Sequence, residues 1–491
     1  MTETSASGNP DGRLRLRDQA ATAVKWSFVG IIGKQGIRFL FVLFLARLIG
    51  PESFGITAQA LTFITFVSLF LDQGIGATVI QRRDLTPLLI GSVFWLNAVT
   101  TLIFVATTFF GAPIIAEFFG TPQLTSLLRV LALDVLFLGF DVMPRALLSR
   151  ALRFRRVASA EIIGAVVGGV VGIVAAVNSA GAWSLVIQVV VTDGLVTLLL
   201  LMGRETFYFR ASWQALRSVW RFSLQVLGFS VINYAARNLD NVFVGKYLGA
   251  KPLAFYSLSY RTLMVPVLGL GQVANRVALP VYARVQHDAP RVRRTFLLGI
   301  RVIALVSFPM MTLVIVEAPK AVHVVLGSAW GPAVIPMQLL ALTGLRQSVQ
   351  STLGPVLLAV GRADLQLYWG LGSSLLYVAS FIIGLQWGIV GVAASYTIVG
   401  FLIAPISVAM LARALGFQSQ MYYRSLIPAV IGSGAMVGVG LISTQGLAAI
   451  GMGDFEIVIM TSALAIAAFW VVIRIFWPSE FSGATALFRV R

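Results

Sequence analysis

Cysteine is absent from this sequence, and histidine occurs only twice, at His287 and His323. The absence of cysteine excludes disulfide bonds, thiolate catalysis and Cys-ligated metal sites. Because the two histidines are far apart in the sequence, a histidine-rich metal centre is not expected either. A phosphate-binding loop is also missing, since GKQ at Gly33 and GKY at Gly245 lack the upstream glycine and the hydroxyl residue of that motif. We therefore predict no metal ion and no cofactor.

Charged residues are scarce, and acidic ones are the scarcer kind: 19 Asp and Glu against 37 Lys and Arg among 491 residues. Hydrophobic residues make up 58% of the chain and the mean hydropathy is +0.89, which is more apolar surface than a soluble core could bury. The composition therefore predicts a polytopic membrane protein. In a soluble protein the formal charge of +18 would suggest a nucleic-acid partner, but basic cytoplasmic loops account for most of it here, so no nucleic acid is expected.

The chain contains about 14 apolar runs of ~20 residues or slightly more, the length that spans a bilayer as a helix. Barrel strands would alternate in polarity, and these runs do not. If the N-terminus is cytoplasmic, about 25 of the 37 basic residues, Arg145 and Arg150 among them, fall in inside segments and about 4 in outside loops. This bias predicts that both termini are cytoplasmic.

A weak internal repeat pairs residues about 199 positions apart. It aligns Arg38 with Arg237 and Gly50 with Gly249, so that each half begins with an arginine-bearing helix, a tight glycine turn and a second helix. We predict an all-α fold with two pseudo-symmetric lobes related by an axis along the membrane normal. The predicted divisions are a cytoplasmic N-terminal tail at 1–23, an N-lobe at 24–218, a C-lobe at 219–415, and two C-terminal helices with a short cytoplasmic tail at 416–491.

Ionisable side chains at membrane depth are costly and normally face a water-filled cavity or a partner. Arg38 and Arg237 lie ~10 residues from the outer ends of their helices, hence ~15 Å deep, and Arg261 reaches a similar level. Guanidinium and ammonium groups suit phosphate and carboxylate. We therefore predict a cavity that binds an anionic, polyhydroxylated molecule. Its predicted residues are Lys34, Arg38, Asn233, Arg237, Asp240, Tyr260, Arg261 and Arg346.

Three aspartates, Asp134, Asp193 and Asp240, oppose these cations, so the interior is predicted to be net positive. They leave a structural alternative open, in which Arg237 pairs with Asp240, and Lys34 or Arg38 with Asp193, as closed ion pairs that stabilise the bundle. The same three aspartates are the predicted sites for a coupling ion, H⁺ or Na⁺.

Glycines at every fourth position, Gly164, Gly168 and Gly172, form one face of an apolar run. Such a face favours close packing of two helices. We expect the contact to lie within the bundle rather than between two copies of the chain.

Several stretches, in order along the chain, resemble the polysaccharide transporter family, the Wzx-type flippases of the multidrug/oligosaccharidyl-lipid/polysaccharide exporter superfamily. They are LARLIGPESFG from Leu45, DQGIG from Asp72, VMPRALLSRALRFRR from Val142, RNLDNVFVGKYLGA from Arg237, YSLSYR ending at Arg261, and GRADL from Gly361. The resemblance implies a V-shaped, MATE-like fold with a central cavity, alternating access, and transport rather than enzymatic catalysis, so that no catalytic residue is expected.

It also implies transfer of undecaprenyl-diphosphate-linked oligosaccharide repeat units across the bacterial inner membrane, for exopolysaccharide, O-antigen lipopolysaccharide or capsule assembly. The expected partners are that anionic lipid-linked oligosaccharide, membrane lipids and a polysaccharide polymerase or export complex, with the protein itself a monomer. Two alternatives stay open. A multidrug or cation antiporter of the same superfamily would favour carboxylates in the cavity, and a membrane polysaccharide polymerase would need a long outer loop with carboxylate or arginine pairs.

Overall fold

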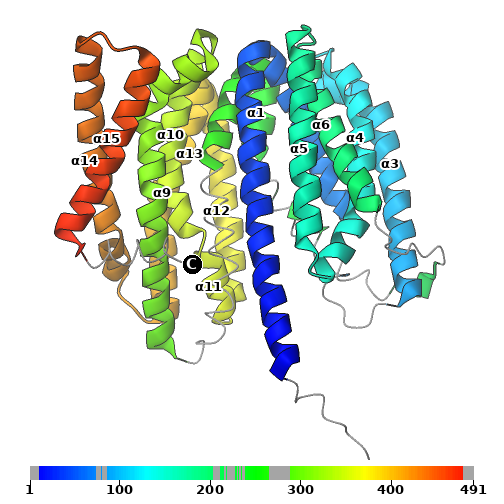
Figure 1. The fold of residues 1–491 in the computed structure, drawn as a ribbon, viewed down its shortest axis with the longest axis horizontal. Coiled ribbons are helices and arrows are strands. Elements are labelled where there is room, and N and C mark those ends of the chain that lie inside the picture. Colours follow the sequence, from blue (N-terminus) through cyan, green and yellow to red (C-terminus); the bar gives the residue numbers. More distant parts are fainter. Residues whose placement is uncertain are drawn as a thin grey trace, which may run out of the picture. The chain divides into compact units, whose positions relative to one another are not determined.

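The described part of the chain is entirely helical. The computed structural model describes residues 10–72, 79, 86–202, 211–214, 217, 227–228, 230–231, 234, 238–264 and 288–478. Within these residues no β-strand occurs (Figure 1), and eight helical segments are long and apolar enough to cross a membrane. The predicted all-α, polytopic membrane class is therefore confirmed. The number of spans, about 14, stays a prediction, because much of the sequence between residues 203 and 287 lies outside the described residues.

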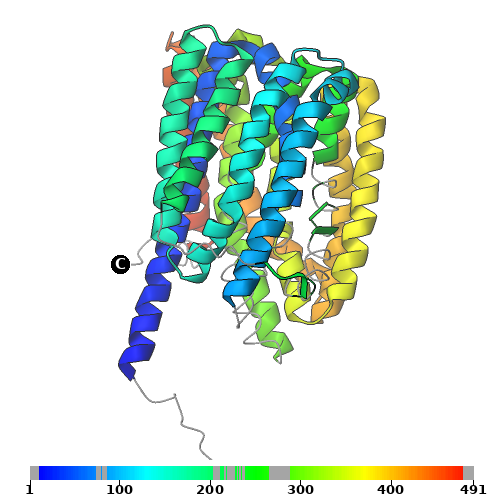
Figure 2. The same ribbon diagram turned by 90° about the vertical axis from the view of Figure 1, so that its right-hand side faces the viewer.

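The chain divides into two compact units, Met1–Asn238 and Leu239–Arg491. Unit 1 consists of long helices that stand side by side, and α1 packs against α5, α4 and α6, while α5 packs on α6 and α3 on α4 (Figure 2). Their bounds are α1 (Pro10–Asp72), α3 (Pro87–Phe119), α4 (Leu124–Arg150), α5 (Phe154–Val177) and α6 (Ala182–Leu201). The lobe boundaries predicted from the sequence stay a prediction.

The start of helix α3 is set by a capping residue and a proline in its sequence. The Thr86 hydroxyl accepts a hydrogen bond from the backbone N–H of Leu89 at 3.2 Å, and Pro87 occupies the first turn, where its missing N–H costs nothing. The helix ends at Gly120 in the left-handed conformation. These caps hold α3 and α4 as an antiparallel pair with a turn of only a few residues.

The glycine turns of the internal repeat share one backbone conformation. Gly50, which kinks α1, has φ 74° and ψ 172°, and Gly249 has φ 93° and ψ −177°. Residues with a Cβ rarely adopt this combination, so each turn depends on glycine. The sequence alignment of Gly50 with Gly249 agrees with this shared geometry.

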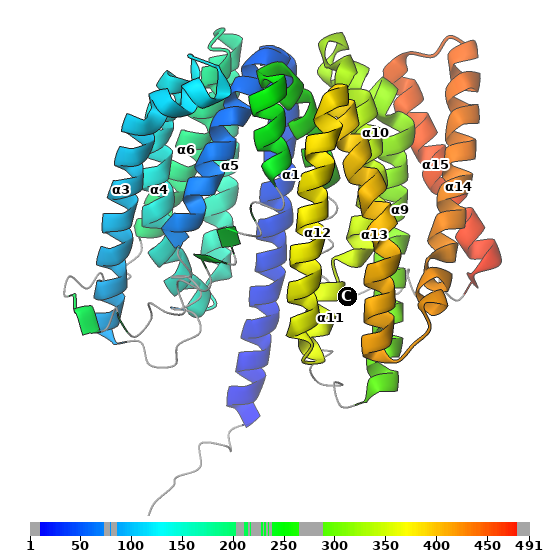
Figure 3. The same cartoon turned by 180° about the vertical axis from the view of Figure 1, so that it is seen from behind.

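Unit 2 is a second helical bundle, in which α9 packs against α10, α14 and α15, and α12 packs against α13 (Figure 3). A π-helical turn, η1 (Val244–Leu248), precedes Gly249, and a helix follows over 250–264. The remaining elements are α9 (Ala289–Leu326), η2 (Ser328–Ala333), α10 (Val334–Gln350), α11 (Leu353–Ala359), α12 (Ala363–Gly384), η3 (Leu385–Trp387), α13 (Gly388–Leu415), α14 (Ser419–Ala449) and α15 (Asp454–Phe476).

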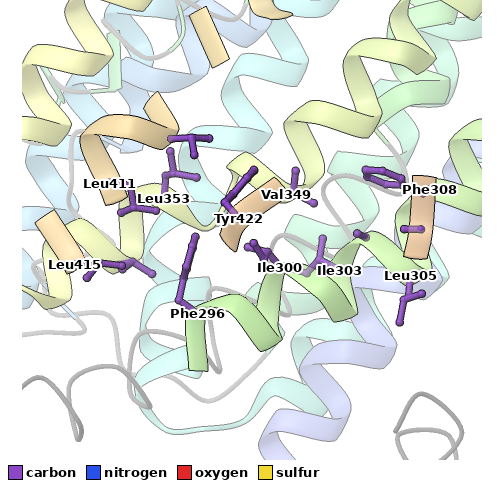
Figure 4. Close-up of a cluster of buried hydrophobic side chains, with 14 of the residues drawn as sticks. Phe296, Ile300, Ile303, Leu305, Phe308, Val349, Leu353, Leu411, Leu415 and Tyr422 are labelled. Atoms are coloured by element: carbon purple, nitrogen blue, oxygen red, sulfur yellow. The ribbon is translucent and has the colours of Figure 1, made fainter. Parts of the chain in front are cut away.

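Buried apolar side chains hold unit 2 together. Phe296 and Ile300 of α9 lie against Val349 of α10, Leu411 of α13 and Tyr422 of α14 (Figure 4). Helices α11 and α15 add Leu353 and Phe469 to the same core, so six of the described helices of unit 2 share it.

The glycine face of α5 packs directly on α6. A Cβ atom at Gly164 would lie 2.8 Å from the backbone oxygen of Thr192, and one at Gly168 would lie 2.8 Å from that of Gln188. At Gly172 the corresponding distance to the Ser184 oxygen is 3.2 Å. The predicted close helix packing within the bundle is confirmed, and we call this contact the α5–α6 glycine seam.

Candidate functional site

Two predicted cations lie one turn apart on α1 and pair with carboxylates on different helices. Lys34 Nζ donates to Glu161 Oε1 of α5 at 2.8 Å, and Arg38 Nη2 donates to Asp193 Oδ1 of α6, also at 2.8 Å. The Arg38–Asp193 pair is the structural alternative that the sequence left open. The partner of Lys34 was not among the predicted residues.

Arg145 on α4 joins the same network. Its Nε donates to Asp141 Oδ2 at 2.7 Å and its Nη1 to Glu161 Oε1 at 2.6 Å, so Glu161 is shared by two cations. The sequence predicts Arg145 in a cytoplasmic segment, whereas α4 continues to Arg150 and carries Arg145 ~8 Å inside its end. The i,i+4 spacing of Asp141 and Arg145 is the signal that could have revealed the pair.

We call these residues the unit 1 charge cluster. In each ion pair the cation is the more exposed partner: the side chain of Arg38 is 37% exposed against 20% for Asp193, and that of Lys34 24% against 11% for Glu161. The carboxylates are therefore more deeply buried than the cations, and the cations are the groups that solvent or a ligand can reach. The cluster comprises Lys34, Arg38 and Arg145 with Asp134, Asp141, Glu161 and Asp193.

The predicted net positive charge of the interior as a whole stays a prediction, but in this cluster four carboxylates lie near three cations. Asp141 and Glu161 were not counted among the interior groups. Asp134 is 1% exposed and close enough to Arg38 and Asp193 to interact with both, while its Oδ1 has no hydrogen-bond partner among the described residues.

In unit 2, Asp240 lies at the centre of a polar group whose described members include no cation. Asp240 is 1% exposed; its Oδ2 accepts a hydrogen bond from Tyr256 Oη at 2.9 Å, and its Oδ1 accepts one from the backbone N–H of Asn241 at 2.7 Å. In the described part of the chain, Asp240 has no ion-pair partner. The predicted Tyr260 stacks on Tyr256, with ring centroids 6.5 Å apart, and the neighbouring Arg261 is half-buried.

Two predicted residues, Asn233 and Arg237, lie outside the described residues. Their place in the site, and the pairing of Arg237 with Asp240, stay predictions.

Arg346 on α10 is a buried predicted cation that has no carboxylate partner among the described residues. It is 9% exposed, it donates through Nη1 to the side-chain oxygen of Gln350, and its Nε has no partner in the described part of the chain. No described carboxylate forms an ion pair with it. Gln350 in turn donates to Ser407 Oγ on α13 at 3.1 Å, which orients its oxygen toward the guanidinium. A buried cation without a counter-ion is costly, so this position calls for an anion.

The fold is similar to that of solved membrane proteins. A solved structure of the lipid II flippase MurJ in an inward closed conformation is similar with a TM-score of 0.70, covering 94% of this chain and 99% of that one. The two sequences are 14% identical, so the likeness concerns the fold.

Residues 44–335 match the family described as polysaccharide biosynthesis protein, which is more than half of the chain. The chain belongs to this family. It is 30% identical to the succinoglycan biosynthesis transport protein ExoT of Rhizobium meliloti (strain 1021) over 351 residues, 71% of each protein. It is 26% identical to the lipopolysaccharide biosynthesis protein WzxC of Escherichia coli (strain K12) over 418 residues, 84% of this chain and 85% of that one. The resemblance to the polysaccharide transporter family is thus confirmed, and the protein is a transporter rather than an enzyme.

Proposed function

We propose that the protein moves undecaprenyl-diphosphate-linked oligosaccharide repeat units from the inner to the outer leaflet of the bacterial inner membrane, for assembly of exopolysaccharide, O-antigen or capsule. The observation that carries the proposal is Arg346, a buried guanidinium with an unpartnered Nε and no described carboxylate beside it. A diphosphate is the part of such a cargo that a guanidinium binds best, because its oxygens accept paired N–H donors. The relatives that act in succinoglycan transport and lipopolysaccharide biosynthesis support the same cargo class.

The unit 1 charge cluster supports a cargo that must be released as well as bound. When no cargo is present, Lys34 and Arg38 keep their carboxylate partners, so neither is left as an isolated charge in the membrane. An arriving diphosphate accepts donors that these side chains do not use in their ion pairs, and the carboxylates limit how tightly it is held. When Lys34 and Arg38 exchange the carboxylates for the diphosphate and back again, the free-energy cost of the cargo-free protein is lowered, and so is the barrier to release of the cargo.

We propose alternating access through a central cavity between two lobes, with the protein as a monomer and both termini in the cytoplasm. The predicted cavity residues Asn233, Arg237, Tyr260 and Arg261 complete the binding site in this proposal. A polysaccharide polymerase or export complex would receive the flipped unit.

The membrane potential favours this direction of transport. An anion that moves toward a positive outside gains about 2.3 kcal/mol per charge per 100 mV. Coupling to H⁺ or Na⁺ would use Asp134, Asp193 or Asp240. Asp134 and Asp240 are better placed than Asp193, because both are 1% exposed and neither forms an ion pair in the described residues.

A cation or multidrug antiporter is the second candidate. The four carboxylates of the unit 1 charge cluster, and Asp240 without an ion-pair partner in the described residues, favour a cationic cargo, whereas Arg346 disfavours it. Two results together would support the antiporter. Overproduction of the protein would lower the accumulation of a cationic dye in cells, and deletion of the protein would leave polymer export unchanged.

The leaflet in which the lipid-linked intermediate accumulates tests the proposal. Cells without the protein should build up single repeat units on the inner leaflet, inaccessible to an external glycosidase, and the wild-type chain should restore export. Arg346→Gln, at normal membrane level, should restore it poorly, whereas Arg413→Gln, an exposed arginine on α13, should restore it fully. Accumulation of single repeats on the outer leaflet would show that the missing step follows flipping and would reject the proposal.

A further inference from the structure

An apolar groove lies on the surface of unit 1, in the crease between α3 and α4. It encloses about 500 Å³ and is lined almost entirely by apolar atoms. Leu102, Phe109 and Phe110 of α3 form one wall, and Val130 and Leu133 of α4 form the other. Phe110 is 77% exposed and Leu133 49%, so these side chains are presented outward rather than packed in the bundle.

One cation lines the groove. The guanidinium of Arg129 lies 5.4 Å from the centre of the Phe109 ring, which fixes it at the groove by a cation–π contact. Arg129 is exposed and forms no ion pair with a carboxylate in the described residues. Its N–H donors are therefore available to an external anion.

The depth of Arg129 matches that of a lipid phosphate rather than of a lipid tail. It lies five residues from the start of α4 at Leu124, hence about 8 Å from the helix end, while the groove continues deeper along both helices. Long basic side chains near a helix end extend toward the membrane interface. By the distribution of basic residues, this end of the bundle is the outer one.

We propose that the groove binds one acyl chain of an anionic glycerophospholipid of the outer leaflet, with the lipid phosphate held by Arg129. The apolar walls accept the hydrocarbon chain, and Arg129, the cation among the described lining residues, selects a headgroup with net negative charge. The site is independent of the proposed cargo site, because its residues belong to neither the unit 1 charge cluster nor the polar group around Asp240.

Lipid retention by the purified full-length protein tests this site. Phosphatidylglycerol and phosphatidylethanolamine are titrated into delipidated protein in detergent, and bound lipids are counted by native mass spectrometry. Wild-type protein should retain one phosphatidylglycerol in preference to phosphatidylethanolamine. Arg129→Gln should bind phosphatidylglycerol about tenfold more weakly, the effect of losing a charge-assisted hydrogen bond, and should lose the preference.

Two further variants distinguish the contribution of the apolar groove to lipid binding from that of Arg129. Ala106→Trp places a bulky ring in the groove and should abolish retention of both lipids, whereas Thr107→Trp, on the next and non-lining residue, should leave retention unchanged. Arg47→Gln, an exposed arginine near the same end of unit 1, is the matched control for charge. All variants should elute from gel filtration as the wild type does, since the substituted side chains are exposed.

The outcomes decide the proposal as follows. Equal retention of phosphatidylglycerol by wild type and Arg129→Gln, or equal affinity of wild type for the two lipids, would overturn it. Inorganic phosphate should not displace the lipid, because the acyl chain contributes most of the binding. Displacement by phosphate alone, or a stronger affinity for undecaprenyl phosphate than for phosphatidylglycerol, would also overturn it by assigning the groove to a different ligand.

Discussion

The guanidinium of Arg346 lies against the backbone of Gly400, so closely that a Cβ atom at position 400 would stand 2.8 Å from Cζ of the arginine. The two residues come from different helices, α10 and α13. The position of the one buried, carboxylate-free arginine described in unit 2 is therefore set by a glycine that itself has no group to bind a ligand.

Gly400→Ala should displace the guanidinium while leaving the bundle folded. The obstructing atoms are the end of a flexible side chain, which can shift, so the membrane level of the variant should stay near that of wild type. Polymer export should fall about tenfold, since a misplaced guanidinium loses a charged hydrogen bond to the cargo. Export and immunoblotted membrane level are measured together. Gly434→Ala, at an exposed α14 glycine with open space around it, is the control, and equal export by the two variants would contradict the role of Arg346.

The Arg38–Asp193 pair can be tested by a double-mutant cycle. Arg38→Ala should lower export at least tenfold, and Asp193→Ala should lower the protein level, because it removes the carboxylate that is hydrogen-bonded to a guanidinium in the membrane. The double variant, Arg38→Ala with Asp193→Ala, should reach the wild-type protein level in the membrane but should not regain polymer export. Recovery of both would mean that the pair only stabilises the helices.

Gly168→Ala should destabilise unit 1. The added methyl group would meet the Gln188 backbone oxygen at 2.8 Å as well as the Thr192 side chain, and backbone cannot move aside at low cost. Overpacking of this kind costs about 1–3 kcal/mol. Thermal unfolding in detergent should therefore shift to lower temperature, and Gly111→Ala, on α3 with no atom near the new methyl group, should unfold as the wild type does. If the Gly168→Ala protein were as stable as wild type, α5 and α6 could move apart at this contact without loss of stability, which would contradict the prediction.

Asp240→Asn removes a buried negative charge and keeps the shape of the side chain. If Asp240 binds the coupling ion, transport by the variant in vesicles should no longer respond to a gradient of H⁺ or Na⁺, although transport driven by the membrane potential should persist. Asp364→Asn, an exposed carboxylate paired with Arg362, should retain the wild-type response. An unaltered gradient response in Asp240→Asn would exclude this residue from coupling.

Features set by local sequence could be predicted. Helical spans follow from the length of apolar runs, the α5–α6 glycine seam from glycines spaced by four, and the equivalent turns at Gly50 and Gly249 from the repeat. The pairing of Arg38 with Asp193 was one of the alternatives that the sequence left open, in which either Lys34 or Arg38 pairs with Asp193.

Partners that depend on helix rotation could not be predicted. Glu161 accepts from Lys34 and Arg145 because α5 turns that side chain toward both α1 and α4, and nothing in the sequence around Glu161 specifies this direction. Arg145 was assigned to a cytoplasmic segment because it stands in a stretch rich in arginine, where the end of the helix has no local marker.

Lys34 and Arg38 are bonded to α5 and α6 respectively, and the glycine seam joins these two helices backbone to backbone. The two cations lie one turn apart on α1, so α1 itself sets the spacing between them, and their ion pairs tie α1 to the two helices that the seam joins. A diphosphate would therefore meet the same spacing between the two positive charges from either side of the membrane. The direction of transport has to depend on parts of the protein other than α1, α5 and α6.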